Sequence, residues 1–335
     1  MATLGLDWKL LEARPVGPTG GRIVSVANQK GGVAKTTTSV NLAAALAMRG
    51  HKTLIVDVDP QGNATTGLGI ARDGVERSSY DLLLGDASLA EVARPTAIEG
   101  LDCAPASLDL AGAEVELVSS LAREHKLAEA LADATDRYRM IFVDCPPSLG
   151  LLTINALVAA RDLIVPVQCE YYALEGLGQL LSTAERVRRS LNSELRIAGV
   201  VLTMYDARTK LSGQVAEEVR SHFGSLVYKT VIPRSVRLSE APSFGEPVLT
   251  LDPSSRGSIS YKLLAGEVEE RYQLAETSVT EQAPTPAIEG KPTPAPTPGP
   301  GGRGYGHTTA EPGGLREAWP REPVWRERVE SGRDR

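Results

Sequence analysis

The segment Asn28–Thr37 reads Asn-Gln-Lys-Gly-Gly-Val-Ala-Lys-Thr-Thr, and it constrains the fold more than any other part of the chain. It follows the β-branched run Ile23–Val26 and precedes Val40–Met48, an apolar segment with helical spacing. A glycine-rich turn between a strand and a helix forms a phosphate cradle, because backbone N–H groups point inward and the helix N-terminus adds partial positive charge. The segment therefore predicts a strand, a phosphate-binding loop and a helix, in that order.

The loop departs from the usual Walker A string. That string has glycine six positions before its lysine and directly before it, where this chain has Gln29 and Ala34. A second lysine, Lys30, stands at the loop entrance instead. An alanine before Lys35 is tolerable only if its backbone keeps a negative φ and its Cβ points away from the phosphates, which is the conformation we expect. Lys35 is placed to reach the β- and γ-phosphates of a nucleotide, and the expected contacts come from Lys30, Gly31, Gly32, Val33, Ala34, Lys35, Thr36 and Thr37.

Acidic residues after apolar strands complete the expected site. Asp144 follows Met140–Val143, which is the Walker B arrangement, and we expect it to hold Mg²⁺ through water while the Thr36 hydroxyl ligates the ion directly. Asp57 and Asp59 end an earlier strand and point to the same side, since strand residues alternate faces. Asp59 lies further out and is expected to orient the attacking water. Asp57 is expected near Lys35 and the metal.

Strands and helical patterns alternate between residues 21 and 275. Several of the strands are continuous apolar runs, which is typical of strands covered on both faces. The alternation predicts an α/β fold, a doubly wound, mostly parallel sheet flanked by helices, with ligands at the carboxyl ends of the strands. The expected strands are 22–27, 53–58, 100–103, 140–143, 163–167, 197–202 and 226–231. The expected helices are 36–49, 174–191, 210–223 and 255–272.

Composition divides the chain into three parts. Ten of its 22 prolines lie beyond residue 275, followed by a glycine-rich stretch, so 276–335 is expected to be a disordered Pro/Gly-rich tail. Residues 1–20 are expected to be a flexible leader, and 21–275 one nucleotide-binding domain. The leader lacks a signal-peptide pattern, and the three cysteines are odd in number without a Cys-x-x-Cys pair. These features favour a cytoplasmic location.

Four motifs together resemble the ParA/Soj family, deviant Walker A ATPases of the P-loop class that partition chromosomes and plasmids. They are the phosphate loop, Asp-Val-Asp-Pro-Gln-Gly-Asn-Ala-Thr at 57–65, Asp-Cys-Pro-Pro-Ser-Leu-Gly at 144–150, and Pro-Arg-Ser-Val-Arg-Leu-Ser-Glu-Ala-Pro-Ser at 233–243. The resemblance covers about residues 21–270. It implies ATP and Mg²⁺ as cofactors and hydrolysis of ATP as the activity.

The resemblance also implies partners. It predicts an ATP-dependent sandwich homodimer in which Lys30 crosses to the phosphates of the other subunit, where a cation in trans neutralises charge that develops during phosphoryl transfer. It places adenine contacts at Pro233 and Ser235. A ParB-type centromere-binding protein is the implied stimulator of hydrolysis.

Charge along the chain is compatible with DNA binding. The net charge is −6, which by itself argues against a nucleic-acid binder. The segment 174–240, however, holds ten basic and seven acidic residues. Such a patch suits non-specific binding of duplex DNA through phosphates, and a dimer would double the contacts. The resemblance points first to Arg208 and Arg237, and Arg186 and Arg189 come next. ATP-bound protein is therefore expected on the nucleoid.

Three other classes share the phosphate loop. A MinD-like membrane-positioning ATPase needs a C-terminal amphipathic helix, whereas Pro320 and Pro323 break the pattern of this C-terminus, and no membrane contact is expected. An iron protein of the nitrogenase type needs two cysteine ligands per subunit in glycine-rich loops, which Cys103 and Cys145 do not offer. A synthetase of the dethiobiotin or cobyrinate type needs a small-molecule pocket, for which no dedicated residue pattern is visible. A MinD-like membrane-positioning ATPase is the main alternative to a DNA-partitioning ATPase.

Overall fold

A computed structural model of the chain describes residues 20–170 and 175–274. All of them belong to one structural unit, Met1–Val279. The predicted leader, apart from Gly20, and the predicted tail lie outside the described residues. The predictions made for those two segments therefore stay predictions.

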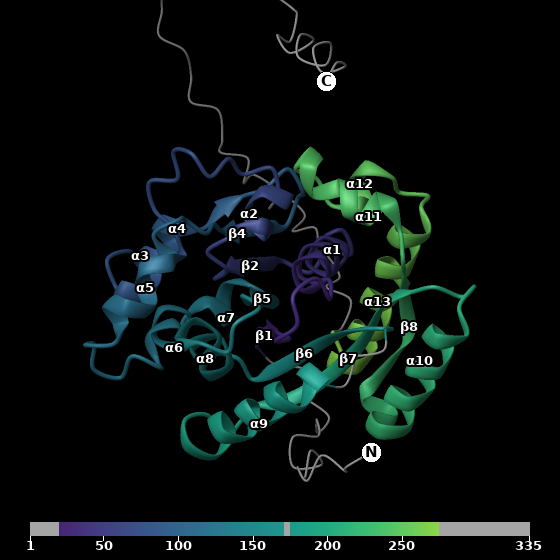
Figure 1. The fold of residues 1–335 in the computed structure, drawn as a ribbon. Helices are drawn as coiled ribbons and strands as arrows, with labels where there is room; N and C mark the ends of the chain where they lie inside the picture. Colours follow the sequence, from purple (N-terminus) through teal and green to yellow (C-terminus); the bar gives the residue numbers. More distant parts are fainter. Residues whose placement is uncertain (1–19, 171–174, 275–335) are drawn as a thin grey trace, which may run out of the picture. The chain divides into compact units, whose positions relative to one another are not determined.

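An eight-stranded sheet runs through this unit in the order β3-β4-β2-β5-β1-β6-β7-β8 (Figure 1). Every neighbouring pair is parallel except β3 with β4, so the predicted doubly wound, mostly parallel sheet is confirmed. The strands are β1 (Arg22–Val26), β2 (Thr53–Asp57), β3 (Arg94–Pro95), β4 (Leu101–Ala104), β5 (Met140–Asp144), β6 (Asp162–Gln168), β7 (Arg196–Tyr205) and β8 (Val227–Pro233). Seven of them match the predicted strands within a few residues, and β3 was not predicted.

The four predicted helices are present with small changes at their ends. Within residues 20–170 and 175–274, nine further α-helices of four to nine residues were not predicted, because a period of 3.6 residues cannot be recognised over so few turns. The helices are α1 (Lys35–Ala47), α2 (Asn63–Gly67), α3 (Ser79–Leu84), α4 (Leu89–Val92), α5 (Leu110–Leu117), α6 (Lys126–Ala130), α7 (Ala134–Arg137), α8 (Leu151–Ala159), α9 (Glu175–Ser190), α10 (Lys210–Phe223), α11 (Val236–Glu240), α12 (Val248–Leu251) and α13 (Arg256–Tyr272).

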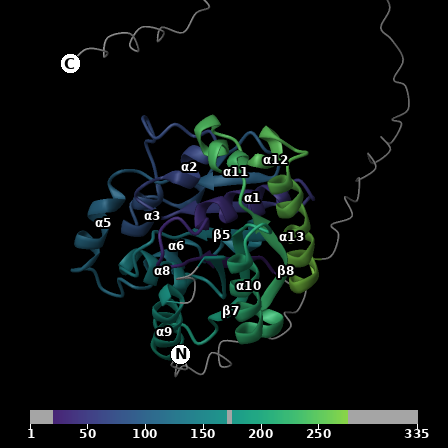
Figure 2. The same ribbon diagram turned by 45° about the vertical axis from the view of Figure 1, so that its right-hand side comes forward.

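Helices cover both faces of the sheet, which is why the strands read as continuous apolar runs (Figures 1 and 2). Side chains alternate between the two faces along each strand: in β2, Leu54 and Val56 join one apolar cluster and Ile55 joins the other. The first cluster includes side chains of α3, α5, α6, α8, α9 and α10. The second includes side chains of α1, α12 and α13.

The centre of the sheet positions the site. β1 lies between β5 and β6, so the loop that leaves it emerges between their carboxyl ends. In an open α/β sheet, this crevice is where ligands bind. The last residues of β2 and β5, Asp57 and Asp144, are register partners at the same edge. The expected phosphate loop and the expected acidic residues therefore meet at one place.

Candidate nucleotide-binding site

Neighbouring strands hold the loop between β1 and α1. The buried Asn28 amide donates a hydrogen bond to the carbonyl of Pro166 on β6 at 2.7 Å, and its side-chain oxygen accepts the Lys30 N–H at 3.0 Å. Further along, the Thr203 hydroxyl of β7 donates to the Val33 carbonyl at 3.1 Å. The loop is thus anchored near both ends, while Gly31 and Gly32 between the anchors are exposed.

Two residues of the loop have left-handed backbone. Gly32 has φ of 73° and Ala34 has φ of 67°. The expected negative φ of Ala34 is therefore wrong. Ala34 is the N-cap of α1, and its carbonyl accepts the Thr38 N–H at 2.9 Å, so the turn into the helix falls on this residue. Closely spaced left-handed residues make backbone N–H groups converge on an anion. A left-handed residue with a Cβ costs roughly 1–2 kcal/mol, so this conformation is imposed on Ala34 by the turn into α1.

Lys35 opens α1 and turns back across the loop. Its ammonium donates to the carbonyl of Lys30 at 3.2 Å, and the residue is only 7% exposed. Burial lowers the pKa of Lys35, and the negative charge of Asp144 opposes that shift. The N–H groups in the first turn of a helix have no acceptor within the helix, so α1 offers donors to an anion beside this ammonium.

Asp144 at the end of β5 is bound by two hydroxyls of α1. Thr36 Oγ1 donates to one carboxylate oxygen at 2.8 Å, and Ser39 Oγ donates to the other at 2.7 Å. Burial, and next the charge of Asp57, raises the pKa of Asp144 to about 7. A buried carboxylate with a neighbouring hydroxyl suits a hard cation such as Mg²⁺, which binds few protein oxygens and keeps several waters. Thr36 and Asp144 thus fit the metal site expected from the sequence.

Asp57 fixes the start of α2. Its carboxylate accepts both the N–H and the hydroxyl of Thr65, at 2.8 and 2.7 Å, and the N–H of Asp59 at 3.2 Å. Burial raises the pKa of Asp57 to about 6, and the hydrogen bonds from Thr65 oppose this shift. Its hydrogen-bond partners are therefore Asp59 and Thr65 in the segment that follows β2, and the expected place of Asp57 near Lys35 and the metal stays a prediction.

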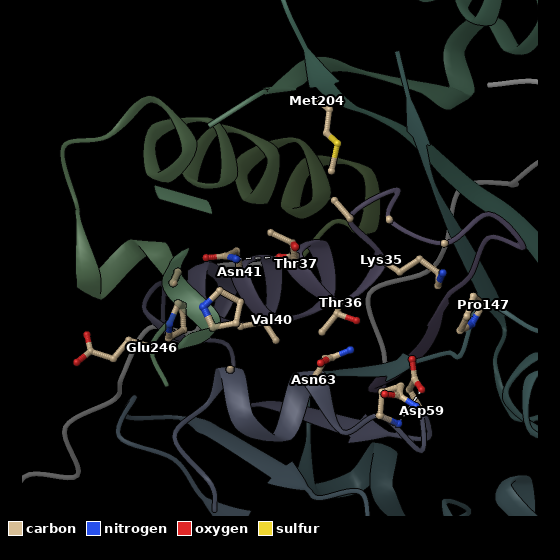
Figure 3. Close-up of a pocket in the computed structure, with 18 residues that line it drawn as sticks. Lys35, Thr36, Thr37, Val40, Asn41, Asp59, Asn63, Pro147, Met204 and Glu246 are labelled. Atoms are coloured by element: carbon tan, nitrogen blue, oxygen red, sulfur yellow. Dashed lines mark hydrogen bonds between the residues drawn. The ribbon is translucent and has the colours of Figure 1, made fainter. Parts of the chain in front are cut away.

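Asp59 belongs to the same turn and lines the cavity beside Lys35 (Figure 3). One of its carboxylate oxygens accepts the Gln61 N–H at 2.9 Å, and its carbonyl accepts the Gly62 N–H at 2.8 Å. The charge of Asp59 also acts on Lys35. This position suits the expected role of orienting water, which stays a prediction.

A cavity of about 350 Å³ opens above the loop. In Figure 3, Lys35, Thr36 and Asp59 lie at one end, and Val40, Asn41 and Glu246 at the other. Most of the residues that line the cavity were not predicted individually from the sequence. Pro147 and Pro242 belong to two of the four motifs, whereas Met204 and Pro247 lie outside them. The lining residues are Gly31, Gly32, Ala34, Lys35, Thr36, Thr37, Val40, Asn41, Asp59, Gln61, Asn63, Gly67, Pro147, Met204, Ala241, Pro242, Glu246 and Pro247.

Four predicted contact residues lie outside this wall. Val33 belongs to the loop but its side chain is buried, and Lys30 stands at the loop entrance. Pro233 is the last residue of β8, where it pairs with Tyr205, and Ser235 is the N-cap of α11. The adenine contacts assigned to Pro233 and Ser235 remain a prediction.

The sequence matches known proteins over the part that forms this site. A family profile described as "AAA domain" matches residues 21–197. The sporulation initiation inhibitor protein Soj of Bacillus subtilis is 57% identical over 248 residues, which cover 74% of this chain and 98% of Soj. The chromosome partitioning protein ParA of Caulobacter vibrioides is 54% identical over 74% of this chain and 93% of its own length.

The chain belongs to the ParA/Soj family of partitioning ATPases. The family predicted from the four motifs is therefore confirmed. Among solved structures, cobyrinic acid a,c-diamide synthase from Mycobacterium smegmatis with bound ATP analogue and magnesium is similar, with a TM-score of 0.67. It is 39% identical, and the match covers 76% of this chain and 96% of the synthase.

This ParA/Soj chain carries its predicted DNA-binding arginines in two separate places. Arg208, after β7, and Arg237, on α11, lie beyond the carboxyl ends of β7 and β8. Arg186 and Arg189 lie on α9, which both views show well apart from α11 (Figures 1 and 2). The structure therefore does not join the four residues into one patch.

Acidic neighbours pair with three of these arginines. Arg208 forms two hydrogen bonds to Asp206, at 2.8 and 2.9 Å, and Arg237 contacts Glu240 at 3.2 Å and Asp252 at 3.5 Å. Arg189 bonds to Glu185 on its own helix. All of these pairs are on the surface, where ion pairs contribute little and exchange readily for phosphate contacts.

The described residues of this family member lack two features. They contain no helix with the length and hydropathy required to cross a bilayer. They also contain no group of three or more His, Cys, Asp or Glu side chains that could hold a metal ion. Any Mg²⁺ at Thr36 and Asp144 would thus complete its coordination with water and nucleotide oxygens.

Proposed function

We propose that this chain is an ATP-driven switch that partitions DNA. ATP and Mg²⁺ are its cofactors, and the ATP-bound homodimer binds duplex DNA without sequence preference. Hydrolysis, stimulated by a ParB-type centromere-binding protein, releases the DNA. The protein acts in the cytoplasm and associates with the nucleoid in its ATP-bound state. The observation that carries the proposal is the 57% identity with Soj over 98% of that protein.

The residues of the site have separate roles in hydrolysis. Lys35 and the first turn of α1 bind the phosphates, and the buried position of Lys35 strengthens this attraction because little water screens it. Thr36 and, through water, Asp144 hold Mg²⁺, which neutralises charge on the transferring phosphoryl group. Asp59 orients the attacking water from its place beside Lys35 in the cavity.

Lys30 makes the site dependent on a second copy. The carbonyl of Lys30 accepts the Lys35 ammonium, so this residue contacts its own site through its main chain. Its side chain starts from the loop entrance and does not line the cavity. We therefore assign the Lys30 ammonium to the phosphates of the partner subunit, where a cation in trans stabilises the charge of phosphoryl transfer.

The relatives favour a chromosome as the cargo. The Caulobacter relative is named as a chromosome partitioning protein, and so is a Myxococcus xanthus relative at 51% identity. Cargo identity follows from the centromere site that the ParB-type partner recognises. Imaging of a tagged chromosomal origin after depletion of the protein tests this point.

Light scattering tests the proposed dimer. The wild-type protein with ATP and Mg²⁺ should double its mass, while the protein with ADP should stay a monomer. The variant Lys30→Ala should dimerise and yet hydrolyse slowly. A wild-type mass that ignores the nucleotide would contradict the proposed switch.

A membrane-positioning activity of the MinD type is the alternative. It requires an amphipathic segment at the C-terminus, and that part of the chain lies outside the described residues. Co-sedimentation with anionic liposomes separates the two functions. ATP-dependent pelleting with lipid and no retention of DNA would favour the MinD-type activity.

The similarity to a cobyrinic acid a,c-diamide synthase raises amide synthesis as a second alternative. The partitioning relatives have the higher identity, 57% and 54% against 39%. ATP hydrolysis without any added acid substrate or amide donor supports the switch. ATP turnover that requires such substrates would support the synthase.

A further inference from the structure

The turn that carries Asp59 is anchored on its inner side. The Val58 N–H donates to the carbonyl of Asp144 at 3.1 Å, and the buried Asp57 carboxylate binds Thr65 at the start of α2. Between these two anchors the chain passes through Asp59, Pro60, Gln61 and Gly62. These anchors fix the two ends of the turn and leave its tip to other contacts.

Arg72 binds the tip of this turn from the outer side. It lies in the connection between α2 and α3, ten residues beyond Gly62. Arg72 Nη1 donates to the carbonyl of Gln61 at 2.7 Å, and Nη2 donates to the carbonyl of Pro60 at 2.8 Å. A planar guanidinium presents its N–H donors in a rigid fork, so it holds two adjacent carbonyls in a fixed geometry that the rotatable donors of an ammonium do not impose.

Packing reinforces these two hydrogen bonds. Gly62 has φ of 62°, and a Cβ on it would lie 2.8 Å from Arg72 Nε, so the guanidinium rests against the glycine backbone. Within the described part of the chain, Nε is buried and has no hydrogen-bond partner. A buried N–H without a partner costs free energy, so Nε does not stabilise this arrangement. The guanidinium is held instead by the two carbonyl contacts, and the absence of a side chain at Gly62 leaves room for it.

Arg72 contacts main-chain atoms, so it fixes the path of the backbone itself. The Asp59 carboxylate is tied to the same path, because it accepts the Gln61 N–H and its own carbonyl accepts the Gly62 N–H. Moving Pro60 and Gln61 would therefore move the carboxylate that faces Lys35 in the cavity. Arg72 has no direct place in the cavity wall.

We propose that Arg72 is a positioning residue. It holds the Pro60–Gly62 turn in place and so orients the Asp59 carboxylate for hydrolysis. This inference rests on the role of Asp59 in the proposed function. It assigns Arg72 an effect on turnover and little effect on nucleotide binding, because Lys35 and the first turn of α1 hold the phosphates. A misplacement of about 1 Å in a catalytic group can lower a rate by roughly 100-fold.

Steady-state ATP hydrolysis by the full-length chain tests the inference. Arg72→Met keeps the aliphatic bulk and removes both donors, and Arg72→Lys keeps the charge and one donor group. Arg77→Met is the matched control, since Arg77 lies in the same connection and pairs with Asp81 on the surface. Asp59→Asn is measured in parallel, with thermal melting and equilibrium binding of an ATP analogue for every variant.

The expected result is a split between turnover and binding. For Arg72→Met, kcat falls about 10- to 100-fold while the affinity for the ATP analogue changes less than about 3-fold. The kcat of Arg72→Lys lies between those of Arg72→Met and the wild type, and Arg77→Met keeps the wild-type kcat. Melting temperatures stay close to that of the wild type.

Other outcomes overturn the inference. A wild-type kcat for Arg72→Met, an equal fall of kcat and nucleotide affinity, or an equal loss in Arg77→Met would each do so. If Asp59→Asn hydrolyses ATP normally, the proposed role of Asp59 fails as well. If Asp59→Asn is inactive and Arg72→Met is normal, only the Arg72 inference fails.

Discussion

Asp57 and Asp144 are register partners at the ends of two neighbouring parallel strands, and both are fully buried carboxylates. They serve different elements: Asp57 binds Thr65 of α2, and Asp144 binds Thr36 and Ser39 of α1. The pair thus connects the start of α1, which carries Thr36, with the turn that carries Asp59.

This pair predicts how the stability of the nucleotide-free protein depends on pH. Burial raises the pKa of Asp144 to about 7, with the charge of Asp57 adding to the shift, and raises the pKa of Asp57 to about 6. Unfolded aspartate titrates near about 3.9, so between about pH 4 and pH 7 the folded chain binds more protons than the unfolded chain. Stability therefore falls as pH rises through this window, and Tm should drop by roughly 3–6 °C between about pH 5.5 and pH 7.5.

Two variants assign this pH dependence to its source. Asp144→Asn should reduce the fall of Tm across this window to the smaller contribution of Asp57. Asp206→Asn should leave it unchanged, because Arg208 lowers the pKa of Asp206 to about 2 and its contribution is lost only below the window. A Tm that rises across the window would contradict the assignment.

Ala34→Gly should stabilise the fold. The left-handed φ of 67° destabilises the folded chain by roughly 1–2 kcal/mol, and glycine removes this cost. The greater entropy of glycine in the unfolded chain reduces the gain by about 0.4–1 kcal/mol. The free energy of unfolding, measured with denaturant, should therefore rise by about 0.5–1 kcal/mol. Ala45→Gly in the interior of α1 should lose about 1 kcal/mol, and a loss in Ala34→Gly would show that this backbone carries no such cost. Both wild type and Ala34→Gly should bind ATP.

Asp59→Asn should slow hydrolysis and spare binding. The amide keeps the acceptor for the Gln61 N–H and removes the charge that orients water, so kcat should fall at least about 100-fold. Affinity for an ATP analogue should stay within about 3-fold of wild type. Asp73→Asn, on the exposed connection after α2, is the control. Equal kcat values for the two variants would remove Asp59 from the reaction.

Arg208→Ala and Arg237→Ala should weaken DNA binding by removing phosphate contacts. Each should lower the slope of log affinity against log salt by about 1 per subunit, with little dependence on DNA sequence. Arg189→Ala is the comparison on α9, which lies apart from the other two arginines. A salt slope unchanged by Arg208→Ala and Arg237→Ala would place the DNA surface elsewhere.

Much of the fold and the centre of the site followed from local patterns. Apolar strands and the long helices are periodic enough to be recognised, and motif spacing brought Thr36 and Asp144 to one edge of the sheet. The φ of Ala34 was predicted wrongly, because a steric rule for one residue ignored the turn that the loop must make.

Contacts between distant segments were not predictable from pattern. The bond from Asn28 to Pro166 joins residues 138 positions apart, and Met204 reaches the cavity from β7. The contact of Arg72 with the Gln61 carbonyl leaves no trace in sequence, because any residue at position 61 offers the same carbonyl. Such features depend on how the elements pack.

A DNA mobility shift tests the central claim most directly. Wild type and Asp59→Ala are compared on a duplex of arbitrary sequence with ATP, ADP or a non-hydrolysable analogue. We expect retention with ATP and with the analogue, none with ADP, and the most persistent complex for Asp59→Ala with ATP. Binding that is equal in all nucleotide states, or absent in all of them, would contradict the account.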